Sequence, residues 1–183
     1  TYNNGSAYTF TWQNGRELAS GTKGSNSFSY TYNADGLRTQ KVVGNQTYTY
    51  YWQGSQLAAM TVSVNGTVTE TLKFYYDSNG IPFILEYNGT TYFYVTNLQG
   101  DVIGLATDEG VVAYYKYDAW GQIISMDAAS DVPYNALVAN PLRYRGYIWD
   151  EDNNLYYLKS RYYNPKLGRF SNSDISMGKK VFC

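Results

Sequence analysis

The chain has 183 residues with 22 Tyr, 7 Phe and 4 Trp, while 16% of its residues are charged and its formal net charge is −1. A nearly neutral chain has no general positive field to attract nucleic acid, and a chain without His lacks the commonest metal ligand and general base. Because its one cysteine is Cys183 and its apolar runs are short, we expect no internal disulfide, no cofactor or metal, no nucleic-acid partner and no membrane span.

One phrase recurs along the first two thirds of the chain: an aromatic residue, any residue, a second aromatic residue, and a short polar stretch that ends in Gly. Six copies occupy residues 10–15, 30–36, 50–54, 74–80, 92–100 and 115–121. The rings of the last five copies belong to Tyr30, Tyr32, Tyr50, Trp52, Phe74, Tyr76, Tyr92, Tyr94, Tyr115 and Tyr117. A period of about 20 residues is typical of one β-hairpin per unit.

Each phrase combines the chemistry of a strand with that of a turn. Residues two apart point to the same face of a strand, so each phrase gives one sheet face a pair of rings. The pairs Asn14-Gly15, Asp35-Gly36 and Asn79-Gly80 provide the positive φ that tight reversals need. Rings of neighbouring strands add about 0.2–1 kcal/mol per cross-strand pair. The sequence therefore predicts an all-β fold in which stacked antiparallel hairpins form one strongly curved sheet over residues 1–124.

The pattern changes after residue 124. Residues 125–139 are small and polar with one proline, Pro133, and they predict a linker with at most a short helical turn around residues 134–138. From residue 140 onward the aromatic pattern returns in a denser form, and we call residues 140–183 the core motif. Its signature positions are Pro141, Arg143, Tyr144, Gly146, Tyr156, Tyr157, Tyr162, Tyr163, Gly168, Arg169 and Phe170.

These positions resemble the Rhs repeat-associated core, in which Pro-x-Arg-Tyr-x-Gly leads through a Tyr-Tyr strand to Arg-Tyr-Tyr and Gly-Arg-Phe. The upstream phrases resemble YD repeats. The family includes bacterial polymorphic toxins, wall-associated proteins, the C subunits of insecticidal toxin complexes and the teneurins. The resemblance implies a secreted or cell-surface bacterial protein whose YD repeats form a hollow β-shell closed by the core motif. Its implied partners are the remainder of that shell and an enclosed C-terminal toxin.

In many family members the core cleaves its own chain just beyond the motif, using an Arg and an Asp that correspond by position to Arg161 and Asp174. The scissile bond of those members lies in an Asp-Pro-x-Gly element further along. Nine residues follow Asp174 here and none resembles that element, so we expect a structural segment rather than a self-cleaving aspartyl-type autoprotease. The alternative for the two residues is an ordinary salt bridge.

Two further interpretations stay open. Tyr and Trp rings can lie flat on a sugar ring, so the repeats could form a cell-surface adhesin or a glycan-binding module. The arginines of the core motif could form an anion-binding patch, but we expect them to stack on Tyr rings or pair with nearby carboxylates. The arginines are Arg143, Arg145, Arg161 and Arg169, and their expected partners are Tyr144, Tyr147, Tyr162, Tyr163, Asp150, Glu151 and Asp152.

Overall fold

The computed structural model describes residues 2–3, 7–128 and 134–172. These residues fold almost entirely into β-strands, with one short α-helix and one 3-10 turn, which confirms the predicted all-β class. Thirteen of the described strands form one antiparallel sheet in the order β1 to β13, and four more form a second sheet, β14 to β17. Because the strand order follows the chain, the large sheet is the continuous meander that the recurring phrase predicts.

The strands are short and are joined by tight turns. The large sheet contains β1 (Tyr2–Asn3), β2 (Ala7–Gln13), β3 (Glu17–Lys23), β4 (Asn26–Tyr32), β5 (Arg38–Val43), β6 (Gln46–Gln53), β7 (Gln56–Val64), β8 (Thr67–Tyr76), β9 (Pro82–Tyr87), β10 (Thr90–Thr96), β11 (Val102–Thr107), β12 (Gly110–Tyr117) and β13 (Ile123–Ala128). The remaining elements are the helix α1 (Tyr134–Ala139), the 3-10 turn η1 (Tyr144–Gly146), β14 (Ile148–Asp150), β15 (Leu155–Tyr157), β16 (Tyr162–Asn164) and β17 (Arg169–Phe170).

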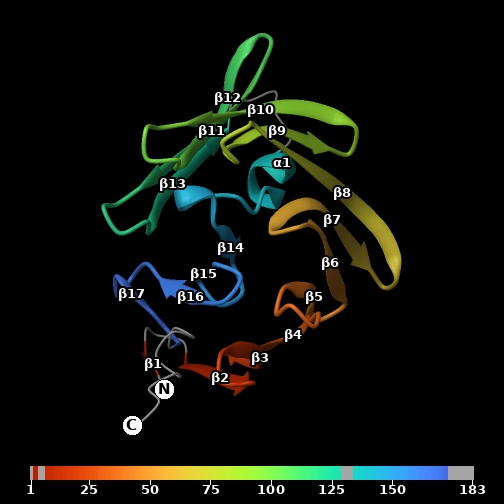
Figure 1. Ribbon diagram of the computed structural model, residues 1–183, viewed down its shortest axis with the longest axis vertical. Helices are drawn as coiled ribbons and strands as arrows, with labels where there is room; N and C mark the ends of the chain where they lie inside the picture. Colours follow the sequence, from red (N-terminus) through yellow and green to blue (C-terminus); the bar gives the residue numbers. More distant parts are fainter. Residues whose placement is uncertain (1, 4–6, 129–133, 173–183) are drawn as a thin grey trace, which may run out of the picture.

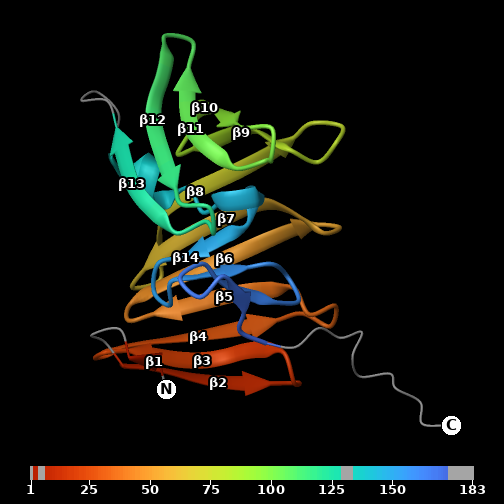
Figure 2. The ribbon, with the colours of Figure 1, turned by 90° about the vertical axis from the view of Figure 1, so that its left-hand side faces the viewer.

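The large sheet bends into a C-shaped wall, and α1 and β14–β17 lie inside the curve (Figure 1). Figure 2 shows the strands following one another from β1 at one end of the molecule to β12 at the other. The resemblance implies a shell that the core motif closes, and the structure places the core motif against the concave face of the sheet. The reason is the apolar character of that face, which would be open to water if the core motif did not cover it.

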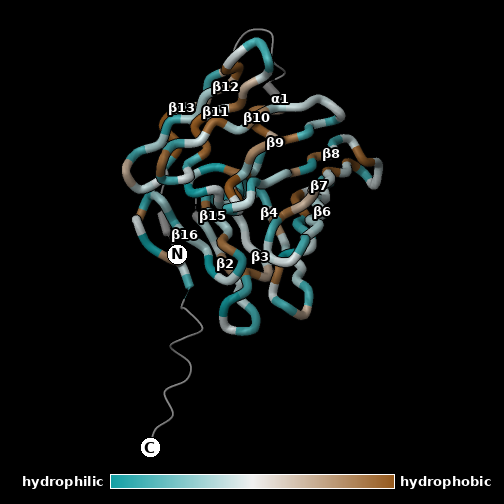
Figure 3. The backbone as a smooth tube through the Cα atoms, turned by 45° about the horizontal axis from the view of Figure 1, so that its top comes forward, coloured by the Kyte–Doolittle hydropathy of each residue, from teal (hydrophilic) through white to brown (hydrophobic). Residues whose placement is uncertain are grey.

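The hydrophobic core lies between the concave face of the wall and the core motif. Its buried members include Leu18, Leu57, Leu72, Leu85, Leu105 and the repeat rings Tyr30, Tyr50, Phe74, Tyr92, Tyr94 and Tyr115. Tyr32, Trp52, Tyr76 and Tyr117 are partly buried and pack against the same cluster. In Figure 3 the hydrophobic stretches lie within the strands and most turns are hydrophilic. The predicted alternation is therefore confirmed, because the middle residues of the phrases, such as Tyr51 and Tyr75, are exposed on the outside.

A β-bulge occurs at the same place in each of the six described hairpins that contain a phrase. The register shifts immediately before the second ring position, which is Trp12, Tyr32, Trp52, Tyr76 and Tyr117 in five units. In the fifth unit along the chain the equivalent position is Thr96, which has no ring. A bulge bends its strand and increases the local right-handed twist. Because the bulges recur on alternate strands, their bends accumulate along the sheet and give the wall its curvature.

The second ring of a phrase is tied by a hydrogen bond to the unit before it. The Tyr76 hydroxyl donates to the Leu57 carbonyl at 2.9 Å, and the Tyr117 hydroxyl donates to the Val102 carbonyl at 2.7 Å. Tyr32 donates in the same way to Leu18 at 3.0 Å, and the indole Nε1 of Trp52 donates to Arg38 at 2.7 Å. Each acceptor lies at the start of the strand that follows the preceding loop. Successive units are therefore joined by hydrogen bonds as well as by the packing of their rings.

Four of the described loops after the second ring position share one hydrogen-bond pattern. In the fourth unit the Asp77 Oδ1 atom accepts from the backbone N–H groups of Asn79 and Ile81, at 2.8 and 2.9 Å. Asn33, Asn97 and Asp118 hold their loops in the same way. In such Asx turns the side-chain oxygen accepts hydrogen bonds from backbone N–H groups that have no backbone acceptor within the chain reversal. The Asn or Asp that follows the second ring position is therefore the residue that shapes the loop.

The positive φ values predicted for the turns are confirmed at Asn14, Gly15, Gly36 and Gly80. The fifth unit differs from its predicted phase. Its loop begins at Asn97, so the two inward positions before it are Tyr94 and Thr96, and the second ring is replaced by Thr96. Tyr92 and Tyr94 are buried and Phe93 is exposed, as the phrase predicts, but the second position has no ring to mark it in the sequence.

The large sheet extends further than the pattern predicts. Strand β13 continues to Ala128, past the predicted end at residue 124, because Met126 and Ala128 pack against the core. The predicted helical turn around residues 134–138 is the helix α1, which ends at Ala139. The division of the chain into residues 1–124, 125–139 and 140–183 stays a prediction.

We expect Asp77→Ala to lower the free energy of unfolding by about 1 kcal/mol, because two backbone N–H groups lose their acceptor. Asp77→Asn keeps the Oδ1 acceptor that Asn33 and Asn97 use in the equivalent loops, so its stability should stay near that of the wild type. Urea unfolding of the three proteins measures the difference. Equal losses in both variants would show that the carboxylate charge, and not the Asx turn, matters at this loop.

Candidate functional site

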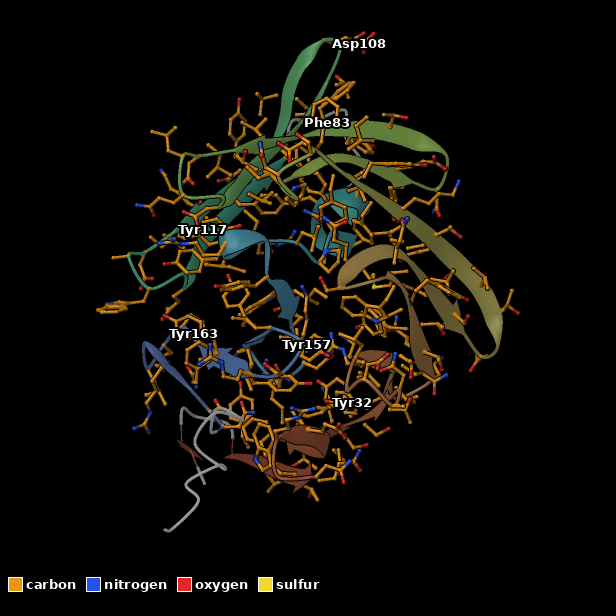
Figure 4. The ribbon with its side chains drawn as sticks, viewed as in Figure 1. Tyr32, Phe83, Asp108, Tyr117, Tyr157 and Tyr163 are labelled. Atoms are coloured by element: carbon orange, nitrogen blue, oxygen red, sulfur yellow. The ribbon has the colours of Figure 1, made fainter. Side chains whose placement is uncertain are left out.

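The core motif crosses the concave side of the wall and binds both ends of it. Figure 4 shows Tyr157 and Tyr163 inside the curve, while Phe83 lies on the outer side of the wall and Asp108 lies at the tip of the β11–β12 hairpin. Tyr157 and Tyr162 reach toward the first units, whereas Tyr156 and Tyr163 reach the loop of the sixth unit. The alternation of adjacent Tyr residues in a strand makes this possible, because neighbours point to opposite faces. The core motif therefore connects parts of the wall that are far apart in the sheet.

Contacts with the first units are aromatic and polar together. The Tyr162 hydroxyl lies 2.7 Å from the Tyr32 hydroxyl, and its ring packs edge-on against Trp12 at 5.7 Å between centroids. The amide of Asn153 donates to the Tyr30 hydroxyl at 2.8 Å, and that of Asn154 donates to the Tyr8 hydroxyl at 2.9 Å. Further along, Asn172 donates to the Arg16 and Ser160 carbonyls at 3.1 Å each. These contacts fix the core motif to β2, β4 and the first loop.

Contacts with the sixth unit converge on its loop. The hydroxyls of Tyr156 and Tyr163 donate to the carbonyls of Gly121 and Trp120, each at 2.8 Å. Gly121 has a φ of 86°, and a Cβ atom there would lie 2.5 Å from the Tyr144 ring. Gly168 has a φ of 62°, and the Trp120 ring would lie 3.1 Å from an added Cβ. Both glycines are thus required by the close approach of an aromatic ring as well as by their backbone.

A buried ion pair joins the wall to the core motif at the centre of this interface. The Arg38 guanidinium on β5 donates to an Asp150 carboxylate oxygen at the end of β14, and both side chains are almost fully buried. The Lys41 ammonium lies 2.7 Å from Asp152 and 3.6 Å from the second Asp150 oxygen. We call Arg38, Lys41, Asp150 and Asp152 the Arg38 cluster. Two positive and two negative charges compensate one another there, which is the condition for burying charge.

Aromatic rings enclose the Arg38 guanidinium. Its carbon lies 4.5 Å from the ring centroids of Tyr50 and Tyr157 and 5.0 Å from that of Tyr30. Such cation–π contacts are strongest where water is excluded. Burial is the largest single effect and opposes the charged form of Arg38, but Asp150 and the surrounding Tyr side chains together outweigh it, and the pKa of the guanidinium lies above its ordinary value. Arg38 therefore stays charged and contacts both β14 and β15.

A second buried cation supports the helix. Arg143 packs on the Tyr115 ring at 4.2 Å, and its Nη2 atom donates to the Leu137 carbonyl at 2.8 Å near the end of α1. A cation at the C-terminus of a helix satisfies its last carbonyls and favours its dipole. Asn140 completes this cluster, because its amide bonds the Tyr94 and Tyr115 hydroxyls at 2.8 and 3.2 Å.

The expected partners of the arginines are partly wrong. Arg145 lies 5.4 Å from the Tyr144 ring, which confirms the expected stacking. Arg143 stacks on Tyr115 of the wall instead of a neighbouring ring. Asp150 pairs with Arg38, an arginine that the sequence interpretation did not consider. The charged side chains of Arg143 and Asp150 are buried against the concave face, where water cannot solvate them. They therefore pair with residues of the wall instead of with each other.

The predicted catalytic pair is placed only in part. Arg161 immediately precedes β16, and its guanidinium lies 3.8 Å from the centroid of the Phe170 ring. Asp174 lies outside the described residues, so the pairing of Arg161 with Asp174 stays a prediction. Arg169 is exposed on β17. Within the described parts of the chain, no group of three His, Cys, Asp or Glu residues could hold a metal ion, and no helix is long and apolar enough to cross a membrane.

Comparison with known proteins gives a consistent result. The family described as Teneurin YD-shell matches residues 3–183. The tRNA3(Ser)-specific nuclease WapA of Bacillus spizizenii is 34% identical over 176 residues, which cover 93% of this chain and 7% of that protein. The tRNA nuclease WapA of Bacillus subtilis strain 168 matches with the same identity and coverage. The chain thus spans a small part of the length of these relatives.

Two solved structures share the fold. The crystal structure of TcdB2-TccC3-TEV superposes with a TM-score of 0.73 at 20% identity, over 92% of this chain and 9% of that one. TcdB2-TccC3 without its hypervariable C-terminal region gives a TM-score of 0.74 with the same identity and coverage.

We expect Asp150→Ala to lower the free energy of unfolding by about 3–5 kcal/mol, because it leaves the Arg38 charge buried without a carboxylate. Guanidinium chloride unfolding measures this loss. Lys73→Ala is the matched control, since it removes an ion pair with Glu86 that lies at the surface and should change stability little. If Asp150→Ala costs no more than Lys73→Ala, the Arg38 cluster does not hold the core motif in place.

We expect the protein to lose stability between about pH 10 and 12. Burial raises the pKa of Tyr157 from 10.0 to about 12, although the nearby Arg38 lowers it in part. Because the folded state resists ionising this phenol, its contribution is complete below the ordinary pKa and is lost as pH rises through the folded value. A shift of this size corresponds to about 3 kcal/mol. Urea unfolding across this pH range, with phenolate absorbance recorded in parallel, measures it. Unfolding midpoints that do not change up to pH 12 would contradict the prediction.

Proposed function

The chain belongs to the teneurin YD-shell family, and on that premise we propose that it is a wall segment of an exported bacterial toxin, enclosing a payload carried elsewhere in the same polypeptide. The whole protein would be a polymorphic toxin of the Rhs type, secreted or displayed at the cell surface. The family match over residues 3–183 and the shared fold of the TcdB2-TccC3 structures support this proposal.

The observation that carries the proposal is a curved wall whose shape is fixed from its concave side. Bulges at equivalent positions bend the sheet, and the core motif then binds the first units and the sixth-unit loop at once. A wall with a fixed radius of curvature suits enclosure. An enzyme built on the same sheet would need an accessible constellation of reactive groups, whereas the charges of the Arg38 cluster are paired and buried.

The large sheet is open at both ends, which supports a continuation of the wall. Within the described residues β1 pairs only with β2, and β13 pairs only with β12. Each leaves a row of backbone groups that a further strand could pair with. We propose that other strands of the same shell occupy these edges. The WapA relatives are named as tRNA nucleases, and this segment corresponds to 7% of their length. We place any such toxic activity in the enclosed payload and not in the wall.

Glycan binding is the second candidate function, and the exposed rings favour it. The repeat rings of the phrases are buried or half-buried beneath the core motif. Rings remain available on the outer side of the wall, at Tyr51, Tyr75, Phe83, Phe93 and Tyr114. An adhesin of this kind would therefore use outward-facing rings, namely the middle residues Tyr51, Tyr75 and Phe93 of the phrases together with Phe83 and Tyr114. Self-cleavage through Arg161 and Asp174 stays a third hypothesis, which depends on residues outside the described part.

We expect the payload of the full-length protein to resist added protease while this segment is folded. A tag at the far end of the payload, followed by immunoblotting during proteinase K digestion, measures protection. Asp150→Ala should shorten the lifetime of the tagged fragment, because the core motif no longer holds the wall. Lys73→Ala is the control and should leave protection unchanged.

Rapid digestion of the payload in the wild-type protein would contradict enclosure. Binding of the folded protein to cell-wall glycan, lost in Tyr114→Ala but not in Asp150→Ala, would instead support the adhesin. The two functions are thus distinguished by separate measurements on the same set of variants.

A further inference from the structure

A groove opens at the rim of the wall where the phrase loops meet the core motif. Its volume is about 360 Å³, and it lies between the loops of the third and fourth units on one side and residues 145–148 and 157–161 on the other. Trp52 and Tyr76 contribute from the wall, while Arg145, Tyr147, Lys159 and Arg161 contribute from the core motif. We call this space the rim groove. It is separate from the Arg38 cluster, whose residues do not line it.

The charged side chains that line the rim groove are of one sign, and Asp101, which pairs with Arg145, lies outside this lining. Three cationic side chains line it, and no Asp or Glu is among the described residues that do so. The cavity that Lys41 lines is of similar size, about 370 Å³, but it also contains Glu70, Glu151 and Asp152. A cleft lined by one sign of charge focuses the field on ligands of the opposite sign. The rim groove is therefore suited to an anionic ligand.

Two of its cations stand on strained backbone. Arg145 has a φ of 57° and Lys159 a φ of 64°, in the left-handed region that costs a residue with a Cβ about 1 kcal/mol. The Asp101 Oδ1 atom accepts from the Arg145 N–H at 3.0 Å and holds that conformation, and it lies 3.5 Å from the Arg145 Nε atom. Glycine at these two positions would relieve the backbone strain. The presence of Arg and Lys there instead indicates that their side chains have a role in the groove.

The floor of the groove is aromatic and apolar. The polar atoms of Trp52 and Tyr76 are engaged with backbone carbonyls of the wall, so these residues offer ring surface to a ligand. Inorganic phosphate could use the cations but not this floor. A peptide with carboxylate and apolar side chains in alternation could use both. Arg161 also lines the groove, but it packs on Phe170, and the argument depends on Lys159 and Arg145.

We propose that the rim groove binds an acidic peptide segment, with its carboxylates against Lys159 and Arg145 and its apolar side chains against Trp52 and Tyr76. This inference is independent of the enclosing role of the wall, because a groove at the rim can bind a peptide whether or not a payload is present.

Fluorescence anisotropy with a labelled Glu-Leu-Glu-Leu-Glu peptide tests the proposal on the full chain. The peptide should bind at low salt, and added salt should weaken it because exposed charges are screened. Lys159→Asn should weaken binding about fivefold, since Asn removes the charge but tolerates the left-handed backbone. Lys166→Asn is the matched control, because Lys166 is exposed and does not line the groove. Unfolding midpoints of both variants confirm that they are folded.

Four results would overturn the proposal, three from direct binding and one from competition. The first is absence of binding to the acidic peptide at up to about 1 mM, a weak affinity for any specific site. The second is equal affinity for a Lys-Leu-Lys-Leu-Lys peptide. The third is an equal effect of Lys159→Asn and Lys166→Asn. Competition with inorganic phosphate identifies the part of the groove that acts: full displacement at low phosphate would show a simple anion site and would also contradict a peptide groove.

Discussion

The position of the core motif depends on one buried ion pair. Arg38 lies at the start of β5 in the large sheet, and Asp150 lies at the end of β14 in the small sheet. Neither charge could remain in the interior without the other. A buried pair of this kind adds little net stability, but any alternative docking of the two sheets would leave a charge unpaired. The pair therefore selects one arrangement among many that would bury similar apolar area. Packing of the Tyr rings then provides most of the favourable free energy around it.

The bulges of the large sheet produce its curvature, and the contacts with the core motif stabilise that curvature. The bulges precede the second ring position in all six phrase-containing hairpins of the described chain, and most of these rings donate a hydrogen bond to the unit before. Local bending and coupling between units are thus set by the same residue. The Tyr hydroxyls of the core motif then bind backbone carbonyls of distant loops, at Gly121 and Gly36 among others. The Asn and charged residues of the core motif instead bind wall side chains, such as Tyr8, Tyr30 and Arg38.

The repeat pattern was sufficient to predict the sheet, since each hairpin is determined by residues within about 20 positions. The fifth unit was placed two residues too early because Thr96 carries no ring at the second position, and only the loop at Asn97 marks that position. The Arg38 cluster could not be predicted in this way. Arg38 and Asp150 are 112 residues apart, and no local periodicity relates two strands of different sheets. A signal did exist, because Arg38 and Lys41 place two cations on one strand of a weakly charged array. The docking of the core motif on the concave face, by contrast, followed from neither composition nor spacing.

The Asx turns close these loops whatever side chains stand at their tips. The two residues between the Asx residue and the last loop residue are Ala34 and Asp35, Ser78 and Asn79, Leu98 and Gln99, and Ala119 and Trp120, yet the four loops are closed by the same bonds. The side chain of Leu98 is fully exposed and that of Trp120 largely so. Side chains at these tip positions can therefore vary in size and polarity while the spacing of the Asx bonds keeps the turn geometry constant. Sequence variation along this margin of the sheet would then change its surface without changing its curvature.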